Sequence, residues 1–158
     1  MILEEIDSPI GHILLASNGR ALCGLEFEGN EERVYRLLDA EFRPGKSGFA
    51  EPLRDYFAGD LAAVETLEVE AQGTDFQKTV WSALRKIPAG QVLSYGQLAA
   101  RIGHPKASRA VGMANARNPV AIVQPCHRVI GANDKLTGYA GGLDRKHWLL
   151  RHEGYLLA

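Results

Sequence analysis

Hydrophobic and polar positions alternate along the first quarter of the chain and then take on a helical spacing. Three short runs, at 1–6, 12–17 and 22–28, have the pattern of β-strands and are separated by turn residues. A helix is predicted over 31–42, with Asn30 as its cap and a buried face of Val34, Leu37, Leu38 and Phe42. A second short helix over 51–59 ends at a glycine. These elements predict a small α/β unit built on an antiparallel sheet.

From residue 74 the pattern is mainly helical. Thr74 and Gln77 form a capping box, and a buried stripe follows at Phe76, Val80, Trp81, Leu84 and Ile87. A second capping box, Ser94 with Gln97, begins a helix that stops at 103, and a third helix is predicted over 107–117. Two short helices joined by a tight glycine-containing turn are typical of a helix-turn-helix. An extended run over 120–124 and a last helix over 144–154 complete the predicted elements.

The length of 158 residues fits one domain of ordinary size or two small domains, and the change of pattern near residue 73 favours two. We predict an N-terminal α/β domain over 1–72 and a mainly α-helical C-terminal domain over 73–158. No apolar run is long enough to span a membrane, and the N-terminus lacks the basic region of a signal peptide. We therefore expect a cytoplasmic protein, in which Cys23 packs in the third strand and forms no disulfide with Cys126.

Charge divides the chain in the same way. Residues 1–72 hold fifteen Asp and Glu against six Lys and Arg, whereas residues 73–158 hold four against twelve. No acidic residue occurs between Asp75 and Asp134, a segment with eight Lys and Arg. Such a block can simply complement an acidic half, but its length favours a surface for a polyanion, most plausibly nucleic acid.

The stretch VQPCHRVIG, 123–131, holds the candidate chemistry. A buried structural cysteine favours apolar neighbours, whereas Cys126 is followed by His127 and Arg128, which can stabilise a thiolate. Contact between the cysteine and the adjacent histidine requires a bend or an intervening water. A catalytic histidine also needs an orienting group, and Glu153 is the best placed of the few acids in this half. The pattern thus predicts a cysteine nucleophile.

The motif NPVAIVQPCHRVIG, followed by TGYAGGLDRKHWLLRHEG, resembles the O6-alkylguanine–DNA alkyltransferase family, and the match is closest to its bacterial constitutive members. The resemblance runs from about Phe76 to the C-terminus. It implies a ribonuclease-H-like N-terminal unit and a winged-helix-like C-terminal domain. It also implies DNA repair: transfer of the alkyl group of O6-alkylguanine, and of O4-alkylthymine, irreversibly to Cys126, once per chain, after the base is flipped out of the duplex.

The resemblance also implies roles for individual residues. His127 deprotonates the thiol through a water, Glu153 holds the imidazole, Asn118 braces the cysteine turn, and Tyr95 protonates or hydrogen-bonds the leaving guanine. Arg109 fills the gap that the flipped base leaves in the stack. The implied DNA-binding residues are Ser94, Lys106, Arg109, Ala110, Arg117 and Arg128. The implied substrate pocket is formed by Val129, Tyr139 and Ala140.

The implied partner is double-stranded DNA that contains O6-alkylguanine, with no cofactor, no metal and no membrane. We expect a monomer in solution, and clustering of several chains on DNA stays open. Two residues depart from the family pattern: Gln124 replaces an aliphatic residue before Pro-Cys, and Ala140 replaces a serine found in some relatives. Two other hypotheses are a cysteine hydrolase, which leaves the basic block unexplained, and a DNA-binding regulator, which leaves the cysteine motif unexplained.

Overall fold

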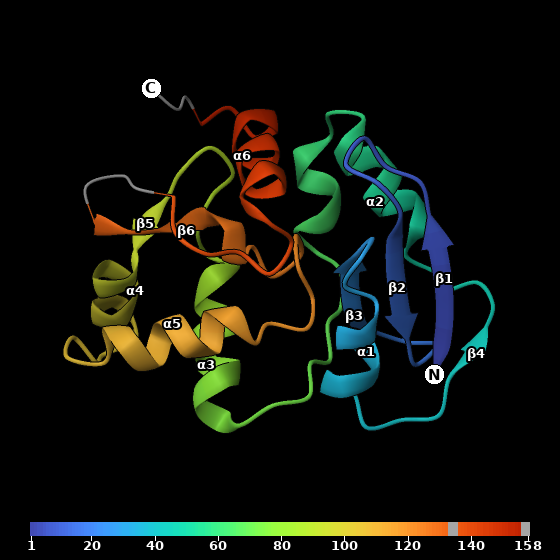
Figure 1. Cartoon of the computed structure of the whole chain (residues 1–158), viewed down its shortest axis with the longest axis horizontal. Coiled ribbons are helices and arrows are strands. Elements are labelled where there is room, and N and C mark those ends of the chain that lie inside the picture. Colours follow the sequence, from blue (N-terminus) through green and yellow to red (C-terminus); the bar gives the residue numbers. More distant parts are fainter. Residues whose placement is uncertain (133–135, 156–158) are drawn as a thin grey trace. The chain divides into compact units, whose positions relative to one another are not determined.

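The computed structural model describes residues 1–132 and 136–155. The chain forms two compact units (Figure 1). Unit 1 comprises residues 1–72 and 119–123, and unit 2 comprises residues 73–118 and 124–158. The short segment 119–123 thus groups with the N-terminal part of the chain, whereas the sequence placed it in the C-terminal domain.

Unit 1 is built on a four-stranded sheet. Strands β1 (Ile2–Ile6), β2 (Ile13–Ser17) and β3 (Leu22–Phe27) are antiparallel neighbours, as predicted from their alternating patterns. A two-residue strand, β4 (Arg43–Pro44), pairs parallel with β1, and the sheet order is β3-β2-β1-β4. The predicted antiparallel sheet is therefore mixed, because β4 is too short to have a readable pattern and runs in the same direction as β1.

Two helices and a 3-10 turn complete the main part of unit 1: α1 (Glu32–Leu37), α2 (Ala50–Phe57) and η1 (Leu61–Val64). The first helix is shorter than predicted, and its N-cap is Glu31, whereas the sequence predicted Asn30. One buried cluster joins it to the sheet through Ala16, Val34 and Leu38. Cys23 is buried in β3, where burial raises the pKa of its thiol. It has the packing role that the sequence predicts.

The segment 119–123 adds to the free side of β3. The amide of Leu25 donates to the carbonyl of Pro119 (2.9 Å), and Leu25 forms an isolated parallel bridge with Val120. The predicted extended run ends there, because the chain turns at 121–123 and Ile122 has a φ of 70°. A positive φ is unusual for a β-branched residue, and it indicates a backbone strained by its surroundings.

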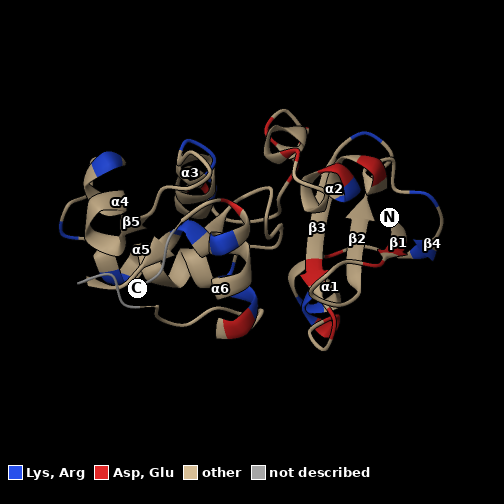
Figure 2. Ribbon diagram, turned by 90° about the horizontal axis from the view of Figure 1, so that it is seen from above, with Lys and Arg blue, Asp and Glu red and all other residues tan. Residues whose placement is uncertain are grey.

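Unit 2 contains the predicted helix-turn-helix. Helices α3 (Asp75–Leu84) and α4 (Tyr95–Arg101) both begin with the complete capping boxes that the sequence predicts. Helix α5 (Ser108–Ala116) follows a tight turn, and the indole of Trp81 in α3 donates to the carbonyl of Ala114 in α5 (2.8 Å). In Figure 2 the ribbons of α4 and α5 carry basic segments and no acidic one.

The remaining elements of unit 2 surround the cysteine motif. Strand β5 (Leu93–Ser94) pairs parallel with β6 (Val129–Ile130), and the 3-10 turn η2 (Cys126–Arg128) leads directly into β6. Helix α6 (Leu143–His152) packs its stripe of Lys146, Leu149 and Leu150 inward. None of the helices in the described parts of the chain has the length and apolar character needed to cross a bilayer.

Candidate active site

The cysteine lies in a tight turn that proline makes possible. Pro125 has φ −78° and ψ 71°, the geometry at the centre of an inverse γ-turn, and the amide of Cys126 donates to the carbonyl of Gln124 (2.7 Å). The amide of Arg128 then donates to the carbonyl of Pro125 (3.0 Å), which closes η2. Cys126 is buried at 6% exposure, so only a group that enters the site can meet its sulfur.

The histidine and the glutamate predicted to work together are in contact. His127 Nε2 lies 2.9 Å from Glu153 Oε2, and both side chains are buried. Because the carboxylate can only accept, Nε2 carries the proton, and the neutral ring then presents a lone pair on Nδ1. Nδ1 is buried and has no hydrogen-bond partner among the described residues. The imidazole can therefore accept one proton at Nδ1.

The protonation states of this pair follow from burial and charge. Burial lowers the pKa of His127 below its usual range, against the opposing effect of Glu153. Burial by itself would raise the pKa of Glu153, but the charges and hydrogen bonds of His127 and Arg128 outweigh it and hold that pKa well below its usual range. A neutral imidazole beside an ionised carboxylate is the arrangement of a general base with its orienting acid.

Arg128, which the resemblance assigns to DNA binding, is not exposed. Its side chain is buried, and Nε and Nη2 donate to the two oxygens of Glu153 at 2.8 and 2.9 Å. Nη1 donates to the carbonyl of Ile87 at 2.6 Å. The guanidinium is therefore not available for the DNA contact that the resemblance implies, because it is buried and its donors are used by Glu153 and Ile87.

Asn118 is joined to the residue two positions before the cysteine. Its amide donates to the main-chain carbonyl of Gln124, and the Gln124 side-chain amide donates back to Asn118 Oδ1, both at 2.7 Å. Gln124, which departs from the family pattern, thus makes a second hydrogen bond with Asn118, the residue predicted to hold the cysteine turn. Sequence reasoning gave no role to Asn115, whose amide lies 3.4 Å from the carbonyl of Cys126.

The parallel pairing of β5 with β6 brings the start of α4 to the cysteine motif. Ser94 is opposite Ile130 in the register and caps α4 by accepting from the amide of Gln97. The next residue, Tyr95, has its hydroxyl 3.2 Å from Thr137 Oγ1. The tyrosine predicted to act on the leaving base therefore contacts the loop that contains two of the predicted pocket residues, Tyr139 and Ala140.

Lys146 holds that loop against β6. Its ammonium donates to the carbonyls of Val129 (2.7 Å) and Thr137 (2.9 Å), and its side chain is fully buried. Burial lowers the pKa of Lys146 to about 8, against the opposing effect of nearby Cys126. Of the three predicted pocket residues, Val129 is buried, Tyr139 is half-buried and Ala140 is exposed.

Sequence reasoning did not single out Lys146, although the spacing holds a clue. Lys146, Leu149, Leu150 and Glu153 recur at the i, i+3, i+4, i+7 positions of one helical face. A charged residue at each end of an apolar stripe indicates buried ionic groups that need partners. The pattern alone does not name those partners, because they lie on β6, η2 and the loop.

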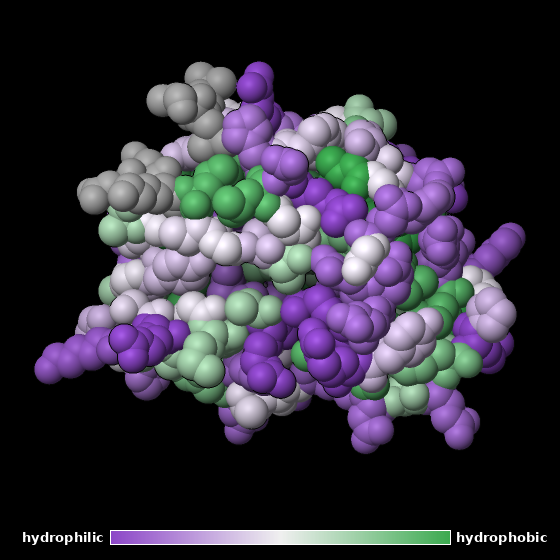
Figure 3. All heavy atoms as spheres, in the orientation of Figure 1, coloured by the Kyte–Doolittle hydropathy of each residue, from purple (hydrophilic) through white to green (hydrophobic). Residues whose placement is uncertain are grey.

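The predicted DNA-binding residues of the helix-turn-helix are on the surface. Lys106, Arg109, Ala110 and Arg117 are exposed on α5 and its flanking turns. Figure 3 shows hydrophilic side chains projecting where α4 and α5 meet. No group of three or more His, Cys, Asp or Glu in the described ranges could hold a metal ion.

Comparisons with known proteins agree with the architecture. A family model described as the 6-O-methylguanine DNA methyltransferase, ribonuclease-like domain matches residues 1–71, and the DNA binding domain of the same class matches residues 75–155. These two domains define a DNA methyltransferase of the 6-O-methylguanine type. The chain belongs to the methylated-DNA–protein-cysteine methyltransferase family, and the predicted family and fold class are confirmed.

Relatives match over nearly the whole chain. The methylated-DNA–protein-cysteine methyltransferase of Salmonella typhimurium is 50% identical, with 99% of this chain and 98% of the relative covered. The protein of the same name from Methanosarcina acetivorans is 48% identical, with 98% and 99% covered. The chain is also similar to the crystal structure of Mycobacterium tuberculosis OGT in complex with DNA, with 45% sequence identity and a TM-score of 0.84. The match covers 97% of this chain and 92% of that one.

Proposed function

We propose that this protein repairs O6-alkylguanine in double-stranded DNA by moving the alkyl group to the sulfur of Cys126. The observation that carries the proposal is the neutral His127, which has Nε2 on Glu153 and a buried Nδ1 open to a proton. The names of the relatives and the structure of Mycobacterium tuberculosis OGT with DNA support the substrate class. O4-alkylthymine presents a similar alkoxy carbon and is the second proposed substrate.

The reaction is a displacement at the alkyl carbon. The thiol proton of Cys126 passes to His127 Nδ1 through a water, and the thiolate then attacks the alkyl carbon. A carbon–sulfur bond forms while the bond from that carbon to O6 breaks with its electron pair on the guanine. The leaving base takes a proton from the hydroxyl of Tyr95, and the resulting phenolate recovers one from the His127 imidazolium through solvent. The products are an intact guanine and a thioether.

The nucleophile is buried, and this supports base flipping. The sulfur of a cysteine that is only 6% exposed cannot approach an atom inside a stacked duplex, so the damaged nucleotide has to enter the protein. We propose that α5 contacts the DNA, that Arg109 occupies the vacated place in the stack, and that Lys106, Ala110, Arg117 and Ser94 bind the flanking backbone. The flipped base would lie against Val129, Tyr139 and Ala140.

A thioether has no good leaving group, and no second thiol belongs to the site, since Cys23 is buried in unit 1. Each chain therefore acts once. Intact mass spectrometry after mixing with an excess of methylated duplex tests this: we expect one added methyl group per chain, lost in Cys126→Ser, which should still bind DNA. Continued turnover would support the cysteine hydrolase, and no added mass would support the DNA-binding regulator.

A further inference from the structure

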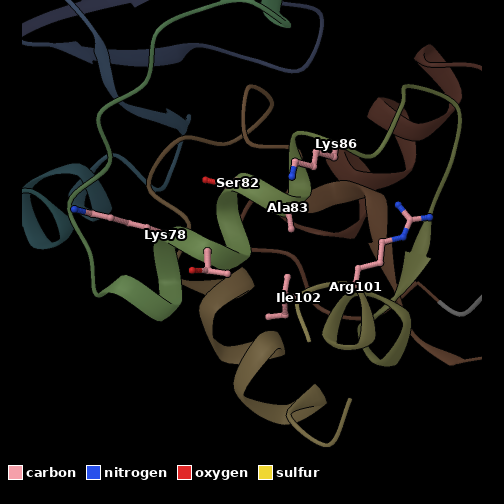
Figure 4. Close-up of a pocket in the computed structure, with 7 residues that line it drawn as sticks. Lys78, Ser82, Ala83, Lys86, Arg101 and Ile102 are labelled. Carbon is pink, nitrogen blue, oxygen red and sulfur yellow. The ribbon is translucent and has the colours of Figure 1, made fainter. Parts of the chain in front are cut away.

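A basic groove lies between α3 and the end of α4, outside the candidate active site. It has a volume of about 530 Å³. Figure 4 shows Ala83 and Ile102 between the two helices, with Lys86 and Arg101 extending from their adjacent ends. The residues that line the groove are Lys78, Thr79, Ser82, Ala83, Lys86, Arg101 and Ile102.

The groove opens on the face of α3 that is turned away from α5. The lining residues that α3 contributes, at 78, 79, 82 and 83, follow each other at steps of one and three residues, so they share one face. Trp81 lies on the other face and donates to Ala114 of α5. A duplex bound along α5 would therefore leave the groove accessible. Neither the proposed chemistry nor the proposed lesion contacts use it.

The cations of the groove are not paired with acids in the part of the chain that the structure describes. Lys78, Lys86 and Arg101 are exposed, and none of them forms an ion pair with any described residue. Asp75, in the first turn of α3, is the one acid on α3 and α4. Three cations gathered without carboxylates create a positive potential that an anion lowers. The groove therefore favours a negatively charged ligand.

The other lining groups narrow the class of that ligand. Ser82 offers an exposed hydroxyl beside the cations, and Lys, Arg and Ser are residues that contact the phosphate oxygens of DNA. No aromatic side chain lines the groove, although protein–protein interfaces are anchored mainly by Tyr, Trp and Arg in desolvated pockets. The chemistry fits a sugar–phosphate backbone better than an acidic protein.

We propose that this groove binds the backbone of a second duplex segment while α5 engages the damaged one. The inference rests on the proposed function for the first segment only. Binding two segments keeps the protein attached to DNA while it searches, because release from one segment leaves the other contact in place.

A bridging assay tests the groove. Undamaged duplex is fixed to beads, and capture of a second, fluorescent duplex by the protein is measured. We expect the double variant Lys86→Ala with Arg101→Ala to lose most of the capture. The slope of log K for capture against log salt concentration should become shallower by about 1.8, near 0.9 for each lost phosphate contact. The control variant, Arg36→Ala with Arg151→Ala, removes two exposed charges elsewhere and should capture like the wild type.

Alkyl transfer in a short duplex, measured in a single turnover, separates the two proposals. The groove variant should transfer at the wild-type rate. Capture equal to the wild type would overturn the second site. An equal loss of transfer and capture would make the groove part of the lesion-binding surface and overturn it too. If poly-glutamate displaced the second duplex more strongly than free duplex does, the groove would be a site for an acidic protein, and the proposal would be overturned. Absence of transfer in the wild type would remove the proposed function and leave the capture result standing.

Discussion

Arg128 and Glu153 form a two-point ion pair inside unit 2, with Nε 2.8 Å from Oε1 and Nη2 2.9 Å from Oε2. The same carboxylate contacts His127, so the arginine fixes the group that orients the imidazole. An arginine beside the nucleophile thus acts on the chemistry through a carboxylate, and its own charge is neutralised by that pairing.

Replacing Arg128 with methionine should lower the free energy of unfolding and slow alkyl transfer. Removal of one partner from a buried ion pair leaves an uncompensated charge and costs about 3–5 kcal/mol. Urea unfolding measures the loss, and single-turnover kinetics measure the rate. Arg117→Met, on the exposed surface, is the matched control for stability. Unchanged stability with weaker DNA binding would return Arg128 to the DNA surface.

Gln124→Val should weaken the brace of the cysteine turn. The variant keeps the bond from Asn118 to the main chain but loses the side-chain bond of 2.7 Å, so about 1 kcal/mol of stability should be lost. We also expect slower transfer, because the turn that carries Cys126 is less firmly held. Gln124→Met is the control for side-chain length and should behave like the valine variant. A faster or unchanged rate in both variants would show that the glutamine is dispensable to the site.

Arg109→Ala should separate base flipping from simple phosphate contact. If the arginine replaces the flipped base in the stack, it offsets an unstacking cost of a few kcal/mol, and its loss slows repair in duplex DNA. Reaction with free O6-benzylguanine needs no flipping and should keep its rate. Lys106→Ala is the phosphate control, with weaker binding and little change in the rate from the bound state. Equal losses on the duplex and on the free base would assign Arg109 a structural role.

The stability difference between the wild type and Lys146→Met should depend on alkaline pH. Burial lowers the folded-state pKa of Lys146 from 10.5 to about 8, so between these values the unfolded state binds more protons. The wild type should therefore gain stability relative to the variant as pH rises through this window, by at most about 1.4 kcal/mol per pH unit. Below pH 8 the difference should be constant. Denaturant unfolding over the pH range measures it, and parallel curves across the window would contradict the shifted pKa.

Local patterns in the sequence predicted the elements that local interactions determine. The capping boxes at Thr74 and Ser94 start α3 and α4 as expected, because both partners of each box lie within one helical turn. The extended conformation predicted for 120–124 is wrong beyond its first residue. Val120 forms one bridge with Leu25, and the turn at Ile122 then ends the pairing. Such a turn depends on tertiary contacts, which the β-propensity of single residues does not describe.

The candidate site shows the same division. The sequence paired His127 with Glu153 because few acids occur in that half of the chain, and the structure brings them to 2.9 Å. The resemblance assigned Arg128 to DNA binding, whereas the structure pairs it with Glu153 inside unit 2. Burial of this residue depends on where α6 packs, and no spacing within 123–131 contains that information.

The pairing of Leu25 with Pro119 and Val120 has a consequence for the order of folding. The strand that contains Leu25 is among the first parts of the chain to be synthesised, whereas its partner follows the complete helix-turn-helix. Unit 1 therefore reaches its final hydrogen bonding only after most of unit 2 has left the ribosome. Contacts between such distant segments slow folding, because a long loop must close before they form. During translation the edge of the N-terminal sheet is consequently unpaired at Leu25, and an unpaired strand edge favours aggregation.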